Sequence, residues 1–407
     1  MIETLETDDL SAPEVIADPY RYFGWLREND PVHWNALFKT WIVTRHGDVV
    51  WLIRNHEVFS SAIEYPKEPT DEYPPIDEAD WGLAEYLKPY RAFIILDRPE
   101  HLAIRQTIHR WFTPKAVERW RGELAAKAQE LVDAHRTAGS MEVKADLATP
   151  LPLLTICWML GVPHADAPRL HELAEVGLDA LRGFAPERLR EAYDANVELW
   201  DYFTPLIEAR AMAPREDLIS MLADGERRGA FTREHCLASL THLLDAGHST
   251  TLGLIAKGTL AFIRSPEQWD LFRRDPERLA PSATEECLRY DPPLKMMPVR
   301  IATQDVELGG KLIRAGDDIA YVIASANRDP RVFADPDRFD ITRSPNPHVA
   351  FGGGIHHCIG AALARIEGQE AFKALARRFS RLRLEREVEY VPNTIHHMLT
   401  ALHVSWT

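Results

Sequence analysis

The sequence predicts a mainly helical protein with a small β region set apart from the helices, an α+β fold. Long amphipathic segments with helical periodicity fill most of residues 114–264. Strand signals are short and few, and they occur on either side of that helical stretch. No internal repeat, low-complexity tract or linker interrupts the 407 residues, so we expect a single domain over residues 1–407.

The first elements are expected to be a helix, a hairpin and a second helix. Asp18 has a residue type favoured at a helix cap, and the proline after it suits the first position of a helix over 19–27. β-Branched and aromatic residues predict short strands at 32–34 and 40–44. A helix is then expected over about 47–55.

The segment 60–96 is rich in proline, aspartate and glutamate and has little periodicity, although a short helix is expected near 81–87. Loops this long in compact proteins are usually functional or disordered. A helix is expected to begin at about Asp97 and to end near Phe112. Long helical patterns then cover 114–136, 166–182, 186–210, 215–227 and 232–264, and strand signals return at 299–302 and 319–323.

Composition and charge narrow the possible functions. The formal net charge of −15 argues against nucleic acid, whose phosphates need a basic surface, and against an anionic membrane as the main partner. The acidic N-terminus does not resemble a signal peptide, and the longest apolar run, 151–162, is too short to span a bilayer. The four widely spaced cysteines form no C-x-x-C pair, which favours a reduced cytoplasmic location over a disulfide framework or a zinc site.

The loop 351–360, with sequence F-G-G-G-I-H-H-C-I-G, carries the strongest chemical signal. Its three consecutive glycines permit a sharp turn and a close approach to a flat ligand, because no Cβ intervenes. Cys358 precedes a strongly helix-forming segment, so we expect its sulfur near a helix N-terminus, where the macrodipole favours a thiolate. Such a thiolate suits the axial position of haem iron. A buried structural cysteine beside a flexible loop is the alternative.

The pattern F-G-G-G-x-H-x-C-x-G resembles the haem-binding loop of the cytochrome P450 family of haem-thiolate monooxygenases. Together with the motifs below, the resemblance covers residues 18–404. It implies the fold of that family, with haem b (iron protoporphyrin IX) between the helix that carries Thr250 and the loop and helix around Cys358. It also implies that Cys358 ligates the iron and that Phe351 and Gly352 belong to the haem-binding loop.

Four further side chains match positions that contact the haem propionates in this family. His101 and Arg105 lie in a D-x-P-x-H-x-x-x-R segment, four residues apart on one helix face. Arg300 matches a strand arginine, and His356 matches a histidine of the cysteine loop. Buried propionates need such partners. For His101 and Arg105, an exposed pair on the surface is the alternative.

Residues 246–250, A-G-H-S-T, resemble the family's oxygen-binding groove, A-G-x-[D/E]-T. Because glycine and threonine weaken a helix interior, we expect a local distortion here, with a packing glycine as the alternative. By the resemblance, Thr250 supports the protonation of dioxygen, while Ser249 stands where the family usually has a carboxylate. Asp245 is one turn before Ser249 and can reach its hydroxyl. Asp245 is therefore a substitute proton source, an anchor for a polar or cationic substrate group together with His242, or a contact with a neighbouring helix.

Glu286 and Arg289 form an E-x-x-R pattern, one helical turn apart, that supports a charge pair. Alone the pattern is weak, because it is common on solvated helices. With Arg338 in D-P-D-R-F it resembles the family's triad of Glu, Arg and Arg. The resemblance implies that this triad holds the core around the cysteine loop and has no catalytic role.

The substrate pocket is expected where pocket positions of the family fall on this chain. They combine apolar surface with unusual polar groups. They are Phe93, Ile94, His242, Asp245, Ala246, Met296, Met297, Ile395 and His396.

The resemblance implies a monomeric oxidoreductase that inserts one oxygen atom of O2 into a small organic substrate, by hydroxylation or by O- or N-dealkylation. Because no flavin- or nicotinamide-binding stretch is present, we expect a separate ferredoxin and its reductase to supply electrons. The candidates for a basic docking patch are Arg105, Arg110, Lys115 and Arg365. Two alternatives are a hydrogen peroxide-driven peroxygenase, which Ser249 motivates, and a non-enzymatic haem sensor, against which Thr250 and the adjacent Gly247 argue.

Overall fold

The computed structural model describes residues 7–62, 91–178 and 186–406. It is mainly helical with small sheets, which confirms the predicted fold class. Its residues group into two compact units: unit 1 is 1–59, 114–152 and 249–407, and unit 2 is 60–113 and 153–248. The expected single domain remains a prediction, because two compact units can belong to one cooperatively folding domain.

The N-terminal part of unit 1 follows its sequence signals closely. The helices α1 (Pro13–Ala17) and α2 (Pro19–Asn29) precede the strands β1 (Val32–Asn35) and β2 (Thr40–Val43), which form an antiparallel hairpin. The carboxylate of Asp18 accepts a hydrogen bond from Tyr20 N at 3.1 Å, so Asp18 caps α2 as expected. The helix α3 (His46–Arg54) lies within a residue of its expected bounds.

The largest sheet joins both ends of unit 1, with strand order β1-β2-β8-β5-β3. Here β3 is Phe59–Ser60, β5 is Met297–Ala302 and β8 is Asp318–Tyr321. The parallel pairing of β2 with β8 aligns Thr40 with Asp318. Alternate residues of β8 enter different core clusters, because successive strand side chains point to opposite faces. Ile319 and Tyr321 pack in the cluster that includes α3, and Ala320 packs with α2.

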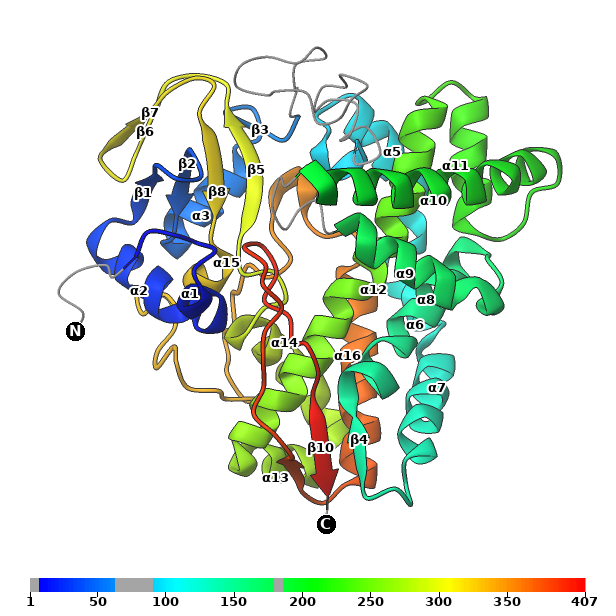
Figure 1. The fold of residues 1–407 in the computed structure, drawn as a ribbon, viewed down its shortest axis with the longest axis vertical. Coiled ribbons are helices and arrows are strands. Elements are labelled where there is room, and N and C mark those ends of the chain that lie inside the picture. The colour runs from blue at the N-terminus through cyan, green and yellow to red at the C-terminus, as the bar shows by residue number, and fades with distance from the viewer. Residues whose placement is uncertain (1–6, 63–90, 179–185, 407) are drawn as a thin grey trace. The chain divides into compact units, whose positions relative to one another are not determined.

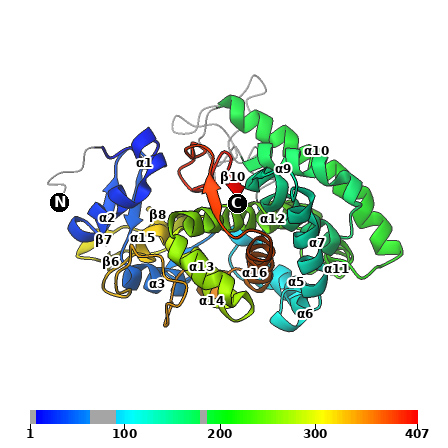
Figure 2. The ribbon, with the colours of Figure 1, turned by 90° about the horizontal axis from the view of Figure 1, so that it is seen from below.

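The helices of unit 1 include one departure from the sequence prediction. The single helix expected over 114–136 is two helices, α6 (Pro114–Glu118) and α7 (Arg121–Ala134). They are separated because Trp120 N donates to Val117 O at 3.0 Å, a tighter turn than that of an α-helix. The helix α16 (Ala361–Arg378) packs against α7, α13 (Pro266–Arg274) and α14 (Pro276–Tyr290), as Figure 2 shows.

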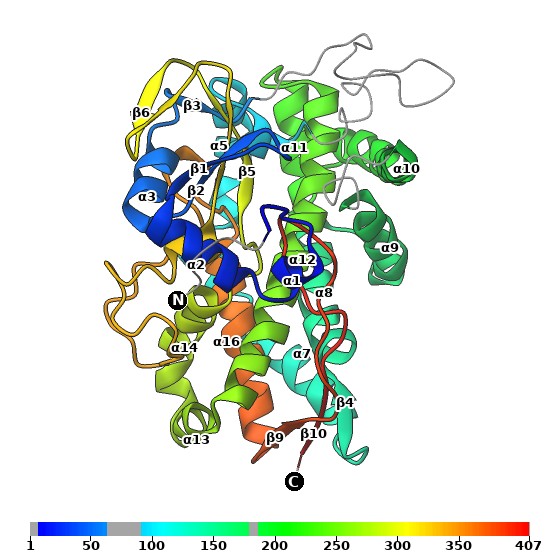
Figure 3. The ribbon, with the colours of Figure 1, turned by 60° about the vertical axis from the view of Figure 1, so that its left-hand side comes forward.

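The short strands of unit 1 were not predicted. A three-stranded sheet has the order β4 (Ser140–Glu142), β10 (His403–Trp406), β9 (Leu382–Leu384) and lies at the C-terminus (Figure 3). The strands β6 (Val306–Leu308) and β7 (Lys311–Ile313) form a hairpin. Its turn is Gly309-Gly310, with φ of 58° and 77°, and a Gly-Gly pair is a recognised hairpin signal.

Unit 2 is built from helices. It contains α5 (Glu100–Ile108), α9 (Ala167–Leu178), α10 (Pro186–Met212) and α11 (Leu218–Arg227), and α9 lies beside α10 (Figure 1). The helices α8 (Pro150–Leu160) and α12 (Arg233–Arg264) each contribute residues to both units. The helix expected near 81–87 falls outside the described residues. Among the described helices, none combines the length and the apolar character that crossing a bilayer requires.

Candidate functional site

The side chain of Cys358 is exposed on a loop just before α16. A hydrogen bond of 2.9 Å from Cys358 N to Phe351 O closes this loop. Gly352 and Gly354 have φ of 63° and 61°, in the left-handed region that favours glycine. The predicted position of Cys358, next to a helix N-terminus that favours a thiolate, is confirmed.

The glycines of the loop also serve its packing against α3. A Cβ at Gly354 would collide with the carbonyl oxygen of Ile53, and one at Gly353 would lie 2.8 Å from Ile53 Cδ1. Side chains at these positions would therefore push the loop away from α3. The sequence suggested close approach to a flat ligand, and the structure adds close approach to the protein's own backbone.

Arg365 holds the cysteine loop from the side of α16. Its guanidinium lies 4.5 Å from the centre of the Phe351 ring and binds Glu285 of α14 at 2.6 and 3.0 Å. Nε2 of His348 is 3.1 Å from the same carboxylate. Burial alone would raise the pKa of Glu285, but His348 and Arg365 lower it to about 2. The charge of Arg365, a candidate for donor docking, is therefore paired within the protein.

One face of α12 differs from the rest of the helix. Between residues 236 and 262, only positions 242, 245, 246, 247 and 250 are partly accessible to solvent. Their spacing places them on one side of the helix, so Thr250 shares a face with His242, Asp245 and Ala246. Ser249 is buried, and its hydroxyl makes no hydrogen bond among the described residues. The expected contact from Asp245 to Ser249 is therefore not formed.

The expected distortion of α12 is absent. The helix runs without a break from Arg233 to Arg264. A Cβ at Gly247 would lie 2.8 Å from Cγ1 of Ile156 on α8. Gly247 is thus the packing glycine that the sequence analysis gave as the alternative, because only glycine lets these two helices approach so closely.

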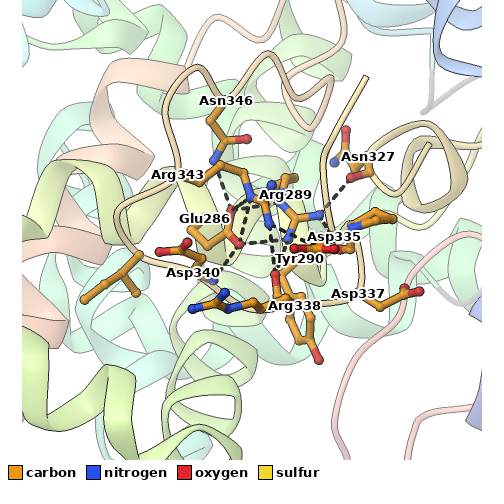
Figure 4. Close-up of polar contacts among 12 residues, drawn as sticks. Glu286, Arg289, Tyr290, Asn327, Asp335, Asp337, Arg338, Asp340, Arg343 and Asn346 are labelled. Carbon is orange, nitrogen blue, oxygen red and sulfur yellow. Dashed lines mark hydrogen bonds and ion pairs between the residues drawn. The ribbon is translucent and has the colours of Figure 1, made fainter. Parts of the chain in front are cut away.

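Glu286 and Arg289 form the predicted pair in the fully buried centre of a larger cluster (Figure 4). Arg289 binds both carboxylate oxygens of Glu286 at 2.8 Å. The second guanidinium on Glu286 belongs to Arg343, at 3.2 and 3.3 Å, and the prediction of Arg338 was wrong. Arg338 instead offers its backbone carbonyl, which accepts from Arg289 and Arg343 at 3.0 and 3.1 Å.

Comparison with known proteins identifies the family of this chain. Residues 278–402 match the family model "Cytochrome P450". The chain is 32% identical to the polyketide biosynthesis cytochrome P450 PksS of Bacillus subtilis, covering 90% of each chain. It is 36% identical to the methyl-branched lipid omega-hydroxylase of Mycobacterium tuberculosis, covering 90% of this chain and 84% of the relative. The chain belongs to the cytochrome P450 family.

The fold of this P450 agrees with that assignment. It matches the solved structure of P450BioI in complex with an acyl carrier protein ligated to hexadec-9Z-enoic acid, with a TM-score of 0.87 and 32% identity. The match covers 98% of this chain and all of that one. Proteins of this family are oxidoreductases with a haem cofactor, and the fit of this chain to haem can be tested on its own side chains.

The residues of unit 1 fit a haem group. Cys358 offers an exposed sulfur, and the adjoining loop is partly accessible along its whole length, including His356. A Cβ at Gly352 would be 3.7 Å from the hydroxyl of Tyr321. The ring of Tyr321 is in turn 5.8 Å from the guanidinium of Arg300, which is nearly buried. Tyr321 therefore lies between the cysteine loop and Arg300, a role that the sequence analysis missed.

In unit 2, His101 and Arg105 lie on one face of α5 as predicted, and the exposed alternative is wrong for His101, which is buried. The ring of Phe93 lies 6.5 Å from His101 and 5.7 Å from His242. Burial lowers the pKa of His242 to about 4, so its imidazole is neutral at pH 7. Phe93 thus brings together a predicted haem contact and a predicted pocket residue.

Asp97 organises the start of α5 in a way that the sequence analysis missed. Its carboxylate accepts hydrogen bonds from Ser60 Oγ at 2.5 Å and Ser61 N at 3.1 Å. His101 N donates to the carbonyl of Asp97 at 2.9 Å. The aspartate of the D-x-P-x-H segment is the available signal, because Asp97 lies four residues before His101, at the start of the helix.

The pocket residues predicted in unit 1 differ in their exposure. Ile395 and His396 are partly accessible, and Ile395 O accepts from Lys295 N at 2.9 Å, which joins the two predicted segments. Met297 is partly buried. Met296 is 3% exposed and packs in the core with Phe23 and Val322, and its place in the pocket stays a prediction.

A second buried polar cluster of unit 1 was not predicted. Lys257 Nζ lies 2.7 Å from Asp291 Oδ1, which also accepts from the hydroxyl of Tyr20 at 2.6 Å and lies 3.0 Å from His397 Nδ1. Burial would raise the pKa of Asp291, but Lys257 and His397 lower it below its usual range. Lys295 is buried too, and its Nζ has no hydrogen-bond partner among the described residues. A lone lysine in an apolar sequence context gives no signal of such a network.

Proposed function

We propose that this P450 is a haem-thiolate monooxygenase that binds haem b through Cys358 and inserts one oxygen atom of O2 into a small organic substrate. The observation that carries the proposal is the exposed Cys358 sulfur at the N-terminus of α16, on a loop that the glycines, Arg365 and α3 hold in place. Haem held by a cysteine thiolate supplies the activation of oxygen.

The other residues of the chain bind and position the reactants. Phe351 and Gly352 shape the loop beside the haem. The propionates are held by cationic or hydrogen-bonding groups, which their burial requires; these groups are His101, Arg105, Arg300 and His356. Thr250 lies on the partly accessible face of α12, where its hydroxyl can donate and accept a proton.

Replacing the cysteine tests the ligand assignment. Cys358→His should abolish the red-shifted absorption band of the reduced carbonyl complex, which is characteristic of thiolate ligation, while haem is retained. Cys157→Ala, at a buried cysteine far from the loop in sequence, is the control and should keep the band. A thiolate band in the Cys358→His variant would overturn the proposal.

We further propose that Asp245 faces the substrate and binds a polar or cationic group. It shares the partly accessible face of α12 with the neutral imidazole of His242 and with Ala246, so this face combines an anionic, a polar and a small apolar side chain. Asp245→Asn should weaken the spin-state response to amine-bearing compounds. The response to neutral compounds of similar size should not change. Unchanged affinity with slower oxygen consumption would instead assign Asp245 to proton delivery. Loss of stability alone would make it a structural contact.

Electrons are proposed to come from a separate iron–sulfur protein that docks near α6 and α16. These helices pack together, and Lys115 of α6 is exposed, whereas Arg365 is paired with Glu285. Lys115→Glu should slow reduction by an acidic ferredoxin at low salt, and the difference should shrink as salt screens the charges over about 10 Å at 0.1 M. A rate that is indifferent to both salt and this substitution would exclude this docking site.

A peroxygenase driven by hydrogen peroxide is the second candidate. Ser249 stands where the family usually has a carboxylate, and its hydroxyl makes no hydrogen bond among the described residues. Product formed with hydrogen peroxide, together with none from any ferredoxin, reductase and O2, would favour this candidate over the monooxygenase.

A further inference from the structure

Three potential metal ligands, none of them given a role above, meet in unit 2. His171 and Glu175 are four residues apart on α9, and His248 lies on α12. One ligand atom from each lies within 4.8 Å of the other two. Figure 3 shows α9 beside the half of α12 that belongs to unit 2.

His248 is arranged as a metal ligand would be. Its Nδ1 lies 2.7 Å from the carbonyl oxygen of Leu244, and because a carbonyl can only accept, Nδ1 carries the proton. The lone pair of Nε2 is then directed outward, toward His171 Nδ1 at 3.1 Å. A backbone carbonyl that fixes the imidazole in this way is the usual outer partner of a metal-bound histidine. Burial lowers the pKa of His248 to about 4, which keeps the ring neutral as metal binding requires.

The separation of the two imidazoles suits a shared ion. Two nitrogen atoms that are 3.1 Å apart and each about 2.05 Å from a metal ion subtend an angle of about 100° at it, between octahedral and tetrahedral values. Glu175 and His171 are partly accessible, so the Glu175 carboxylate can rotate toward the ion and water can reach an open position. Two histidines and one glutamate are an established donor set for Zn²⁺.

We propose that His171, Glu175 and His248 form a binding site for a divalent transition-metal ion such as Zn²⁺, with water completing its coordination. Without the ion, His171 Nδ1–H donates a hydrogen bond to His248 Nε2; with it, His171 takes the other tautomer and both lone pairs point at the metal. The ion would fasten α9 to α12 at the residue directly before Ser249 and Thr250. The proposal is independent of the proposed function.

The test is Zn²⁺ binding to the haem-loaded chain, measured by equilibrium dialysis with elemental analysis. His171→Ala and Glu175→Gln should each weaken Zn²⁺ binding by about tenfold or more, as loss of even an outer partner commonly does. Both positions are partly accessible, so these variants should fold, which haem absorbance and circular dichroism would check. His164→Ala, at an exposed histidine of the same unit, is the matched control and should bind Zn²⁺ like the parent chain.

X-ray absorption at the zinc edge provides a second measurement. The parent chain should show two imidazole nitrogens and a carboxylate oxygen at about 2.0–2.2 Å, and His171→Ala should lose one imidazole. The proposal is overturned if the parent binds no Zn²⁺, or if His171→Ala and Glu175→Gln bind it as tightly as the parent. Equal weakening in His164→Ala would also overturn it, because binding would then be spread over surface histidines.

Discussion

The two buried polar clusters of unit 1 differ in how completely their charged side chains are paired. In the first, the carboxylate of Glu286 receives hydrogen bonds from Arg289, Arg343, Asn346 and the backbone N–H of Asp340. In the second, Asp291 serves Lys257, His397 and Tyr20, while Lys295 has no hydrogen-bond partner among the described residues. In the first cluster both carboxylate oxygens of Glu286 accept hydrogen bonds. The second cluster buries two lysines, but its one carboxylate pairs with Lys257 and not with Lys295.

The difference follows from the side chains that were buried. A guanidinium presents five N–H groups in a fixed plane, and those of Arg289 reach both Glu286 oxygens and the carbonyls of Asn327, Pro336 and Arg338. An ammonium can give up its proton instead, and burial lowers the pKa of Lys295 to about 7. Geometry therefore stabilises the first cluster at any pH near neutral, and protonation controls the second.

The largest effect is expected from Glu286→Gln, which removes the anion that Arg289 and Arg343 share. Leaving buried guanidinium groups unpaired typically costs about 3–5 kcal/mol of the free energy of unfolding. Chemical denaturation of the haem-loaded chain measures this loss. Glu277→Gln is the control: its exposed carboxylate pairs with Lys373 at 2.9 Å, and it should cost about 1 kcal/mol or less. Equal costs for the two variants would show that the Glu286 cluster has no special role.

Lys295→Met should instead stabilise the protein at pH 7, by about 1–4 kcal/mol, because an apolar side chain replaces a poorly paired buried cation. The folded pKa of about 7 lies below the ordinary value of 10.5, so the unfolded chain binds more protons between these values. The contribution of Lys295 to the free energy of unfolding therefore rises with pH across that window. The advantage of the Met variant should shrink from pH 7 to pH 9.5.

Urea denaturation at the two pH values measures this change. Lys257→Met is the matched control, since it removes the lysine that Asp291 does pair with and should destabilise the protein. The interpretation that Lys295 is a buried cation without a partner fails in either of two cases. In the first, Lys295→Met and Lys257→Met change the free energy of unfolding in the same direction. In the second, the change caused by Lys295→Met does not depend on pH.

The smallest effect is expected from Glu285→Gln, next to Glu286 but only partly buried. Loss of its pairs with Arg365 and His348 should cost about 1 kcal/mol at pH 7. Because the folded pKa of Glu285 is lowered to about 2, its contribution is present above the unfolded value of 4.5 and is lost as pH falls toward 2. The difference between parent and variant should therefore vanish in acid, as thermal unfolding over that range would show.

The sequence predicted the elements whose signals are local. Asp18 and the following proline mark a helix start, and the glycines before Cys358 mark its loop, because capping and backbone freedom depend on neighbouring residues. The sequence did not predict that Arg343 replaces Arg338 on Glu286, or that Met296 enters the core. Those outcomes depend on which of several nearby side chains reaches a distant partner, and three-residue strands such as β9 are too short to show a period.

The contact of Gly353 and Gly354 with Ile53, and the pairing of β2 with β8, bear on how the chain folds during synthesis. Each joins segments that are separated by most of the sequence. At about 5–20 residues per second, the N-terminal hairpin leaves the ribosome roughly 15–60 s before β8 is made. Throughout that interval the apolar residues of β2 and α3 lack their partners in β8 and in the cysteine loop, although they can already pack against one another. The first sixty residues therefore complete their packing late, and the loop that carries Cys358 can take its place only after nearly the whole chain has emerged.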